Sequence, residues 1–324
     1  MDDPQMTVRT LIALHGFTPQ QEDQIRNAAP GWKTLFGRPK DFSADQLAEA
    51  EVLCGWHASF REILLEQPSK LRWVQLYSSG ADYMPFDLLQ ERGIVLTDAM
   101  QVHPVPVAET VMAMLLAFSR KLHFAVRSQS AAAWEVQNDF TELRGKTLGV
   151  VGAGAIGTEV ARLAGAFGMR TLGVRRSGAP VPHFDAVVPL AQLDEVLADS
   201  DVVVNVLPLT AETTGLYDQA RFAAMKPTSW FINVGRGKSV HTESLVDALR
   251  TGGIAAAGLD VFEQEPLPAD HPLWSMPNVI MTPHIAGNSD QLKERVTELF
   301  TANLLGFIES GRPAHNVIDY RLRY

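Results

Sequence analysis

Short apolar runs alternate with amphipathic stretches along most of this 324-residue chain. Apolar runs bounded by turn residues are typical of buried parallel strands, and apolar positions three or four residues apart are typical of helices that cover them. In the first hundred residues the pattern predicts helices at 19–28 and 43–50, and strands at 8–14, 32–36, 51–54, 73–77 and 94–96. This alternation predicts a small open α/β sheet.

A second series of strand-like runs follows a long apolar helix predicted at 105–123. Its strands are predicted at 148–151, 170–174, 186–188, 202–206, 230–233 and 254–259, and a seventh run at 279–282 closes it. We expect the segment 124–144, with Trp134, to be an exposed arm. Exposed aromatic side chains favour a contact with a second copy of the chain, so this arm is a candidate dimer contact.

The chain ends with an amphipathic helix whose apolar positions share one face: Leu292, Val296, Leu299, Phe300 and Leu304. Such a helix needs a surface to cover, and we expect it to return to the first sheet. The pattern therefore predicts an α/β domain at 104–288, inserted into a smaller α/β domain made of 1–103 and 289–324.

Composition limits the partners. The net charge of −9 argues against a nucleic-acid partner, and no apolar stretch reaches the length of a membrane span. The first ten residues lack the basic and apolar regions of a signal peptide, so we expect a cytoplasmic protein. Cys54 is the single cysteine and lies in an apolar run, so we expect it to be buried.

The stretch KTLGVVGAGAIG at 146–157 has the spacing of a dinucleotide-binding turn. Gly152 allows the tight turn, Gly154 allows the backbone to approach a pyrophosphate, and Gly157 allows the next helix to pack closely on the strand. That helix begins near Ala155 and Ile156, so its free N–H groups and positive end would face the phosphates. We therefore expect 104–288 to be a Rossmann dinucleotide-binding domain, inserted into a flavodoxin-like α/β substrate domain at 1–103 and 289–324.

The next predicted strand ends in Arg175, Arg176 and Ser177. An acid in this place accepts hydrogen bonds from the ribose 2′-hydroxyl of NAD, whereas arginine pairs with the 2′-phosphate of NADP. The loop therefore favours NADPH, with NAD as the alternative cofactor. A solvated basic loop tip is the competing interpretation.

Three polar residues follow later strands. Arg236 comes after 230–233, Glu265 after 254–259 and His284 after 279–282. Ligands of open α/β sheets bind beyond the carboxyl ends of strands, so we expect the three to converge there. Arginine can hold a carboxylate, histidine titrates near neutral pH and can exchange a proton, and a glutamate can orient that histidine. Taken singly, each is also compatible with an ordinary surface loop.

Four stretches in combination resemble the D-isomer-specific 2-hydroxyacid dehydrogenase family: LRGKTLGVVGAGAIG, VLPLTAETTGLY, INVGRG, and GLDVFEQEPLP with TPHIAG. The resemblance implies that Arg236, Glu265 and His284 form the family's catalytic triad, and that Asp260 accepts a hydrogen bond from the nicotinamide carboxamide. It also implies that Ser79 and Gly80 bind the substrate carboxylate. Further cofactor contacts are implied for Leu207, Pro208, Thr213, Val234, Gly235 and Gly287.

The basic loop at 175–177 is similar to that of glyoxylate and hydroxypyruvate reductases within this family. The sequence therefore predicts a homodimeric reductase of small 2-keto acids that uses NADPH. Two alternatives stay open: a dinucleotide-sensing regulatory protein of the same fold, and an NAD-linked enzyme that oxidises D-2-hydroxy acids.

Trp56 follows a predicted strand, and it either lines the substrate pocket or belongs to the domain core. No metal site is predicted, because seven of the other histidines show no spacing typical of metal ligands: His15, His57, His103, His123, His183, His241 and His271.

Overall fold

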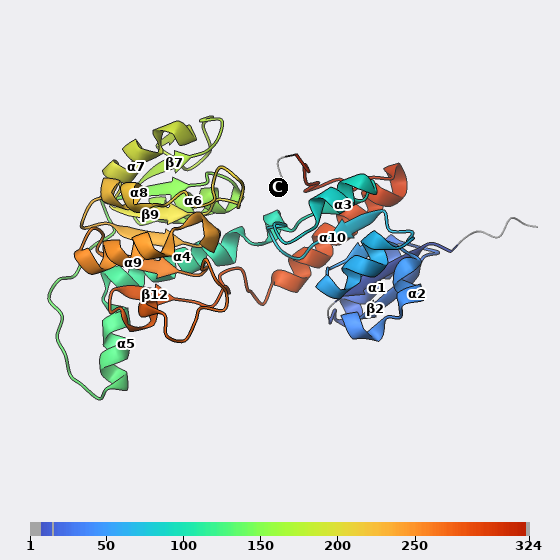
Figure 1. The fold of residues 1–324 in the computed structure, drawn as a ribbon, viewed down its shortest axis with the longest axis horizontal. Helices are drawn as coiled ribbons and strands as arrows, with labels where there is room; N and C mark the ends of the chain where they lie inside the picture. Colours follow the sequence, from blue (N-terminus) through green and yellow to red (C-terminus); the bar gives the residue numbers. More distant parts are fainter. Residues whose placement is uncertain (1–7, 15, 322–324) are drawn as a thin grey trace, which may run out of the picture. The chain divides into compact units, whose positions relative to one another are not determined.

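The computed structural model describes residues 8–14 and 16–321, and the chain forms two compact units. The first contains the residues up to Val102 together with those from Ser289, and the second is His103–Asn288. Each unit is a parallel sheet covered by helices (Figure 1). His15, one of the histidines considered above, lies outside the described residues.

The first unit is built on a five-stranded parallel sheet in the order β2-β1-β3-β4-β5. Its strands are β1 (Thr10–Leu14), β2 (Lys33–Gly37), β3 (Ala50–Cys54), β4 (Trp73–Gln75) and β5 (Val95–Thr97). This is the strand order of flavodoxin-like folds, which confirms the fold predicted for this part of the chain. Cys54 is fully buried, as expected.

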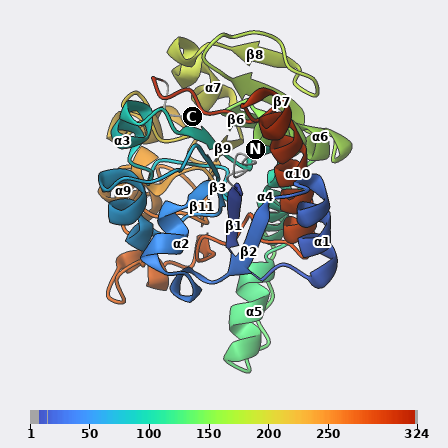
Figure 2. The ribbon, with the colours of Figure 1, turned by 90° about the vertical axis from the view of Figure 1, so that its right-hand side faces the viewer.

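Helices from both ends of the chain cover this sheet. On one face α1 (Pro19–Ala28) packs beside α10 (Leu292–Ser310), and on the other lie α2 (Ala44–Ala48) and α3 (Phe86–Glu91) (Figure 2). The ring centroids of Phe300 and Phe307 in α10 lie 5.3 Å from that of Trp73 in β4, which lies between β3 and β5. The predicted return of the C-terminal helix to the first sheet is therefore confirmed.

The second unit is a seven-stranded parallel sheet in the order β12-β11-β10-β9-β6-β7-β8. Its strands are β6 (Thr147–Val151), β7 (Arg170–Val174), β8 (Ala186–Val188), β9 (Val202–Asn205), β10 (Trp230–Asn233), β11 (Ala256–Leu259) and β12 (Val279–Met281). Counted from β6, the first six strands follow the Rossmann order 3-2-1-4-5-6. The order reverses between β6 and β9, where such folds bind their dinucleotide.

Two apolar layers hold this sheet. On one face α4 (Pro104–Ser119) packs against α6 (Ala155–Ala166), and the other face is covered by α7 (Leu193–Asp199), α8 (Gln219–Ala224) and α9 (Thr242–Thr251). Most strand residues are buried on both faces, which is why these strands read as continuous apolar runs in the sequence.

The prediction of one continuous helix at 105–123, followed by an exposed arm, was wrong at the end of the helix. Helix α4 ends at Ser119, Lys121 adopts a left-handed conformation with φ of 56°, and a separate helix α5 (Leu122–Ser130) begins the arm. Helix α5 projects from the body of the second unit (Figures 1 and 2). The Arg127 guanidinium ties it to this unit by donating to the carbonyl oxygens of Met276, Pro277 and Val279.

Candidate active site

The glycine turn joins β6 to α6 and leaves room for a phosphate. Gly152 has φ of +113°, and a Cβ there would lie 2.9 Å from Cγ2 of Val206. A Cβ on Gly157 would lie 2.3 Å from the carbonyl oxygen of Gly152, so the helix and the turn can meet only at a glycine. A Cβ on Gly154, by contrast, would meet no atom within 4 Å.

The turn therefore fits a dinucleotide pyrophosphate. The first N–H groups of α6, beginning with those of Ala155 and Ile156, have no partner within the helix and stand at its positive end. Gly154 precedes them with an extended backbone and no side chain, so the approach to these donors is open.

The basic loop follows β7, the strand next to β6. Arg175 is half-buried and its backbone N–H donates to Val188 at 3.1 Å, so the start of the loop is fixed to β8. Arg176 and Ser177 are exposed, and the Ser177 hydroxyl accepts the N–H of Ala179 at 3.3 Å. Two guanidinium groups beside the glycine turn suit the 2′-phosphate of NADP.

The segments after β9 and β10 approach each other closely. A Cβ on Gly235 would lie 2.9 Å from the carbonyl oxygen of Leu207, so the two backbones meet at this glycine, next to Val234. Thr213 is buried, and its hydroxyl donates to the carbonyl oxygen of Pro208 at 2.7 Å, which closes the 208–213 loop on itself.

Sequence reasoning missed a buried amide pair beneath these loops. Asn205 and Asn233, the last residues of β9 and β10, are hydrogen-bonded to each other at 2.9 Å. The Asn233 side-chain oxygen also accepts the N–H of Gly235 at 3.1 Å. An asparagine at the end of each of two apolar strands was the available signal.

Arg236 follows β10 and lies half-buried. Its Nη1 donates to the carbonyl oxygen of Gly235 at 2.8 Å. The next residue, Gly237, touches the loop that carries Glu265, since a Cβ there would lie 1.9 Å from the carbonyl carbon of Phe262. The Arg236 loop and the Glu265 loop are thus packed backbone to backbone.

Glu265 and His284 come together from neighbouring strands. Oε2 of Glu265 lies 2.7 Å from Nδ1 of His284, and its Oε1 accepts the N–H of Phe262 at 2.9 Å. The two side chains remain 36% and 52% exposed, so the imidazole is accessible from solvent. The carboxylate can accept a hydrogen bond from the Nδ1–H group, which leaves Nε2 directed away from Glu265.

Asp260 organises the backbone that presents His284. Its side chain is buried, and Oδ1 accepts the Thr282 hydroxyl at 2.7 Å and the N–H groups of Ile285 and Ala286 at 2.9 and 3.1 Å. His284 lies inside this turn with φ of 54°. Asp260 therefore shapes the histidine turn, and its contact with a nicotinamide carboxamide stays a prediction.

Gly287 ends the same turn. Its carbonyl oxygen lies 3.3 Å from Nδ1 of His103, and a Cβ on this glycine would lie 2.9 Å from that nitrogen.

The remaining predicted residues lie in the first unit. Ser79 and Gly80 follow β4 in a half-buried loop, where the Ser78 hydroxyl donates to the carbonyl oxygen of Gly80 at 2.7 Å. Trp56 follows β3 and packs, partly buried, against the apolar core of this unit. The alternative that Trp56 lines the substrate pocket stays a prediction.

Among the described residues, no group of three or more histidine, cysteine, aspartate or glutamate side chains is arranged to hold a metal ion. Within the same residues, no helix has the length and apolar character needed to cross a membrane.

Residues 112–286 match the profile of the D-isomer specific 2-hydroxyacid dehydrogenase NAD binding domain. That range is more than half of the chain. The chain belongs to the D-isomer specific 2-hydroxyacid dehydrogenase family. The matched residues of this dehydrogenase include the glycine turn, the arginine pair, Asp260 and the hydrogen-bonded Glu265 and His284.

Individual relatives extend the similarity beyond that domain. Glyoxylate/hydroxypyruvate reductase B of Klebsiella pneumoniae is 38% identical over 293 residues, which cover 88% of this dehydrogenase and 90% of the relative. A solved family protein from Aeromonas salmonicida is 36% identical, with a TM-score of 0.85 and coverage of 96% and 99% of the two chains.

A third similar protein was solved with a cofactor. The NADPH-dependent glyoxylate/hydroxypyruvate reductase of Sinorhizobium meliloti, in complex with NADP and sulfate, is 27% identical to this dehydrogenase. Its TM-score is 0.80, and the match covers 98% and 100% of the two chains.

Proposed function

We propose that this dehydrogenase reduces small 2-keto acids, such as glyoxylate and hydroxypyruvate, to D-2-hydroxy acids with NADPH. The observation that carries the proposal is the Glu265–His284 hydrogen bond at the ends of β11 and β12, next to Arg236 at the end of β10. The same sheet edge carries the glycine turn. The names of the similar reductases support the substrate class.

Each residue of the triad has a distinct role in this proposal. The planar guanidinium of Arg236 binds the substrate carboxylate and polarises the adjacent keto group. Protonated His284 donates its Nε2 proton to the keto oxygen, while Glu265 holds Nδ1 and stabilises the imidazolium. When bound, NADPH supplies the hydride that reduces the keto carbon.

The choice of NADPH rests on Arg175 and Arg176, the pair that follows β7 where an acid would select NAD. Ser177, in the same loop, offers a hydroxyl to the 2′-phosphate. We also propose that the Ser79–Gly80 loop of the first unit binds carboxylate through its backbone N–H groups, and that the protein is a homodimer.

The first experiment measures NADPH oxidation with glyoxylate, hydroxypyruvate and phenylpyruvate in turn. We expect turnover with at least one of them, and His284→Gln should lower kcat by about 10²- to 10⁴-fold because the proton donor is lost. His241→Gln, at an exposed histidine before α9, is the control and should keep full activity. Tight NADPH binding without any turnover would instead indicate a dinucleotide-sensing protein.

The second experiment tests cofactor choice. Replacing both Arg175 and Arg176 with serine should lower kcat/KM for NADPH by about 10- to 100-fold, because two charge-assisted contacts to a phosphate are lost. The kcat/KM of this variant for NADH should stay close to the wild-type kcat/KM for NADH. Arg170→Ser is the matched control, since Arg170 begins the same strand and pairs with Asp199. A wild-type preference for NADH would contradict the proposal and favour the NAD-linked alternative.

A further inference from the structure

We propose that Glu263 is a positioning residue, which holds the loop 262–268 against Thr242 of α9 and so sets the place of Glu265 beside His284. The inference rests on the proposed function, in which that carboxylate orients the acid–base histidine. Oε2 of Glu263 accepts hydrogen bonds from Thr242, whereas Nδ1 of His284 is bonded to Glu265.

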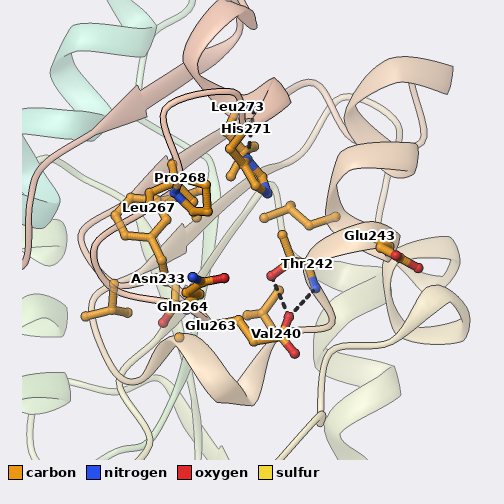
Figure 3. Close-up of a pocket in the computed structure, with 15 residues that line it drawn as sticks. Asn233, Val240, Thr242, Glu243, Glu263, Gln264, Leu267, Pro268, His271 and Leu273 are labelled. Atoms are coloured by element: carbon orange, nitrogen blue, oxygen red, sulfur yellow. Dashed lines mark hydrogen bonds between the residues drawn. The ribbon is translucent and has the colours of Figure 1, made fainter.

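The loop passes over a hollow. A cavity of about 340 Å³ lies under it, bordered by the ends of β10 and β11 and by the start of α9 (Figure 3). Leu267 and Pro268 of the loop form one side, and Thr242 and Glu243 form the other. Phe262 and Leu267 of the loop pack against the apolar core of the unit, whereas Glu263 and Gln264 border the cavity. Individual hydrogen bonds therefore matter more for the stretch between the two apolar residues.

Glu263 makes two such hydrogen bonds across the cavity. Its Oε2 accepts the Thr242 hydroxyl at 2.7 Å and the Thr242 backbone N–H at 3.2 Å. Figure 3 shows both bonds, with the Glu263 carboxylate turned toward Thr242 and Glu243 turned away. Thr242 is the first residue of α9, so the carboxylate also stands at the positive end of that helix.

Other contacts fix the two ends of the loop. At the start, the Phe262 backbone rests against Gly237, and its N–H donates to Glu265 at 2.9 Å. At the far end, the Trp274 indole donates to the carbonyl oxygen of Pro268 at 2.8 Å. Glu263 lies between these ends, two residues from Glu265, so release of its carboxylate would let the catalytic carboxylate move relative to His284.

Four variants separate positioning from general stability. Glu263→Ala and Thr242→Val each remove the side-chain contact, and each should lower kcat about tenfold, while KM for NADPH changes by less than about twofold. Glu263→Gln and Thr242→Ser keep an acceptor and a hydroxyl, so both should retain most of the wild-type kcat. The double variant Glu263→Ala with Thr242→Val should be no slower than the slower single variant.

Glu243→Ala is the matched control, because it removes a carboxylate from the same cavity rim and should leave kcat unchanged. The proposal is overturned if Glu263→Ala keeps the wild-type kcat, if Glu243→Ala loses as much, or if Glu263→Gln is as slow as Glu263→Ala.

A measurement without substrate tests the same contact independently. Amide hydrogen exchange of peptides covering 262–268 should be faster in Glu263→Ala than in the wild type and in Glu263→Gln, with the remaining peptides unchanged. Unchanged exchange in this loop would refute the positioning role even if the wild type proved inactive. Lack of turnover by the wild type with every 2-keto acid would refute only the proposed function.

Discussion

Gly237 lies where the loop of Arg236 contacts the loop of Glu265. It directly follows Arg236, and the space where a side chain would begin is occupied by the backbone of Phe262, in the loop of Glu265. The second glycine of the INVGRG stretch is therefore required by contact between protein backbones. A residue at this position controls how far the arginine and the glutamate are from each other.

We expect Gly237→Ala to separate these loops. A Cβ within 1.9 Å of two backbone atoms of Phe262 forces a shift, which should lower unfolding free energy by about 1–3 kcal/mol and lower kcat as well. Thermal unfolding and steady-state kinetics measure both effects. Gly165→Ala, at an open position within α6, is the control and should be neutral or slightly stabilising. Full activity of Gly237→Ala would contradict this account.

At the residue scale, the sequence predicted that Glu265 and His284 meet, but it did not predict the buried hydrogen bonds around them. Glu265 and His284 could be expected together because each follows a strand of one parallel sheet. The hydrogen bonds of Asp260 and of the Asn205–Asn233 pair could not be predicted, because they depend on side-chain directions that a sequence pattern does not contain.

Among the elements, strands were easier to predict than the break between α4 and α5. Buried parallel strands are marked by apolar runs, and their predicted positions lie within one or two residues of those observed. The break at Lys121 carries no glycine or proline. Its left-handed backbone accompanies an ion pair between Lys121 and Asp139, a contact made by the folded arm.

The end of β5 carries a buried carboxyl that makes the first unit sensitive to pH. Asp98 follows this strand, and its Oδ1 accepts the N–H of Met100 at 3.0 Å. Burial raises the pKa of Asp98 from 3.8 to about 6, although hydrogen bonds from Met100 and Asn316 oppose the change. Between about pH 4 and pH 6, the Asp98 carboxyl thus keeps its proton in the folded state, whereas it has lost it in the unfolded chain.

Because the pKa of Asp98 is higher in the folded state, the free energy of unfolding should fall as pH rises from about 4 to about 6, where ionised Asp98 disfavours the folded state. The contribution is at most about 3 kcal/mol. Asp98→Asn removes the titrating group, so the difference between wild type and variant should change across this range and level off above it. Urea unfolding at several pH values measures the difference. A difference that is constant with pH would contradict the assignment.

For the whole molecule, the arm is the surface best suited to a second copy. Five large apolar side chains in or beside α5 are at least half exposed: Leu122, Val126, Trp134, Val136 and Phe140. A cluster of this kind is rare on monomeric proteins and typical of interfaces.

We therefore expect Trp134→Ser combined with Phe140→Ser to convert a dimer into monomers, as measured by sedimentation or by light scattering after gel filtration. Phe167→Ser is the matched control, since Phe167 is an exposed aromatic residue at the end of α6 and should leave the mass unchanged. A wild type that is already monomeric would contradict the proposed homodimer.

At this scale the fold class could be predicted because the insertion leaves a mark in the sequence. The amphipathic pattern of 292–304 lies after the last strand of the second sheet, and its apolar face needed another surface.

The covering of Trp73 by α10 also determines the order in which the protein can be completed during synthesis. The inserted unit, which ends at Asn288, has all of its strands once that residue has left the ribosome. The part of the first sheet around Trp73 that α10 covers stays exposed until that helix emerges, even though the five strands of the sheet are made first. The first sheet, whose strands are made earliest, is therefore completed last, and Trp73 lacks its two phenylalanine neighbours until α10 has been made.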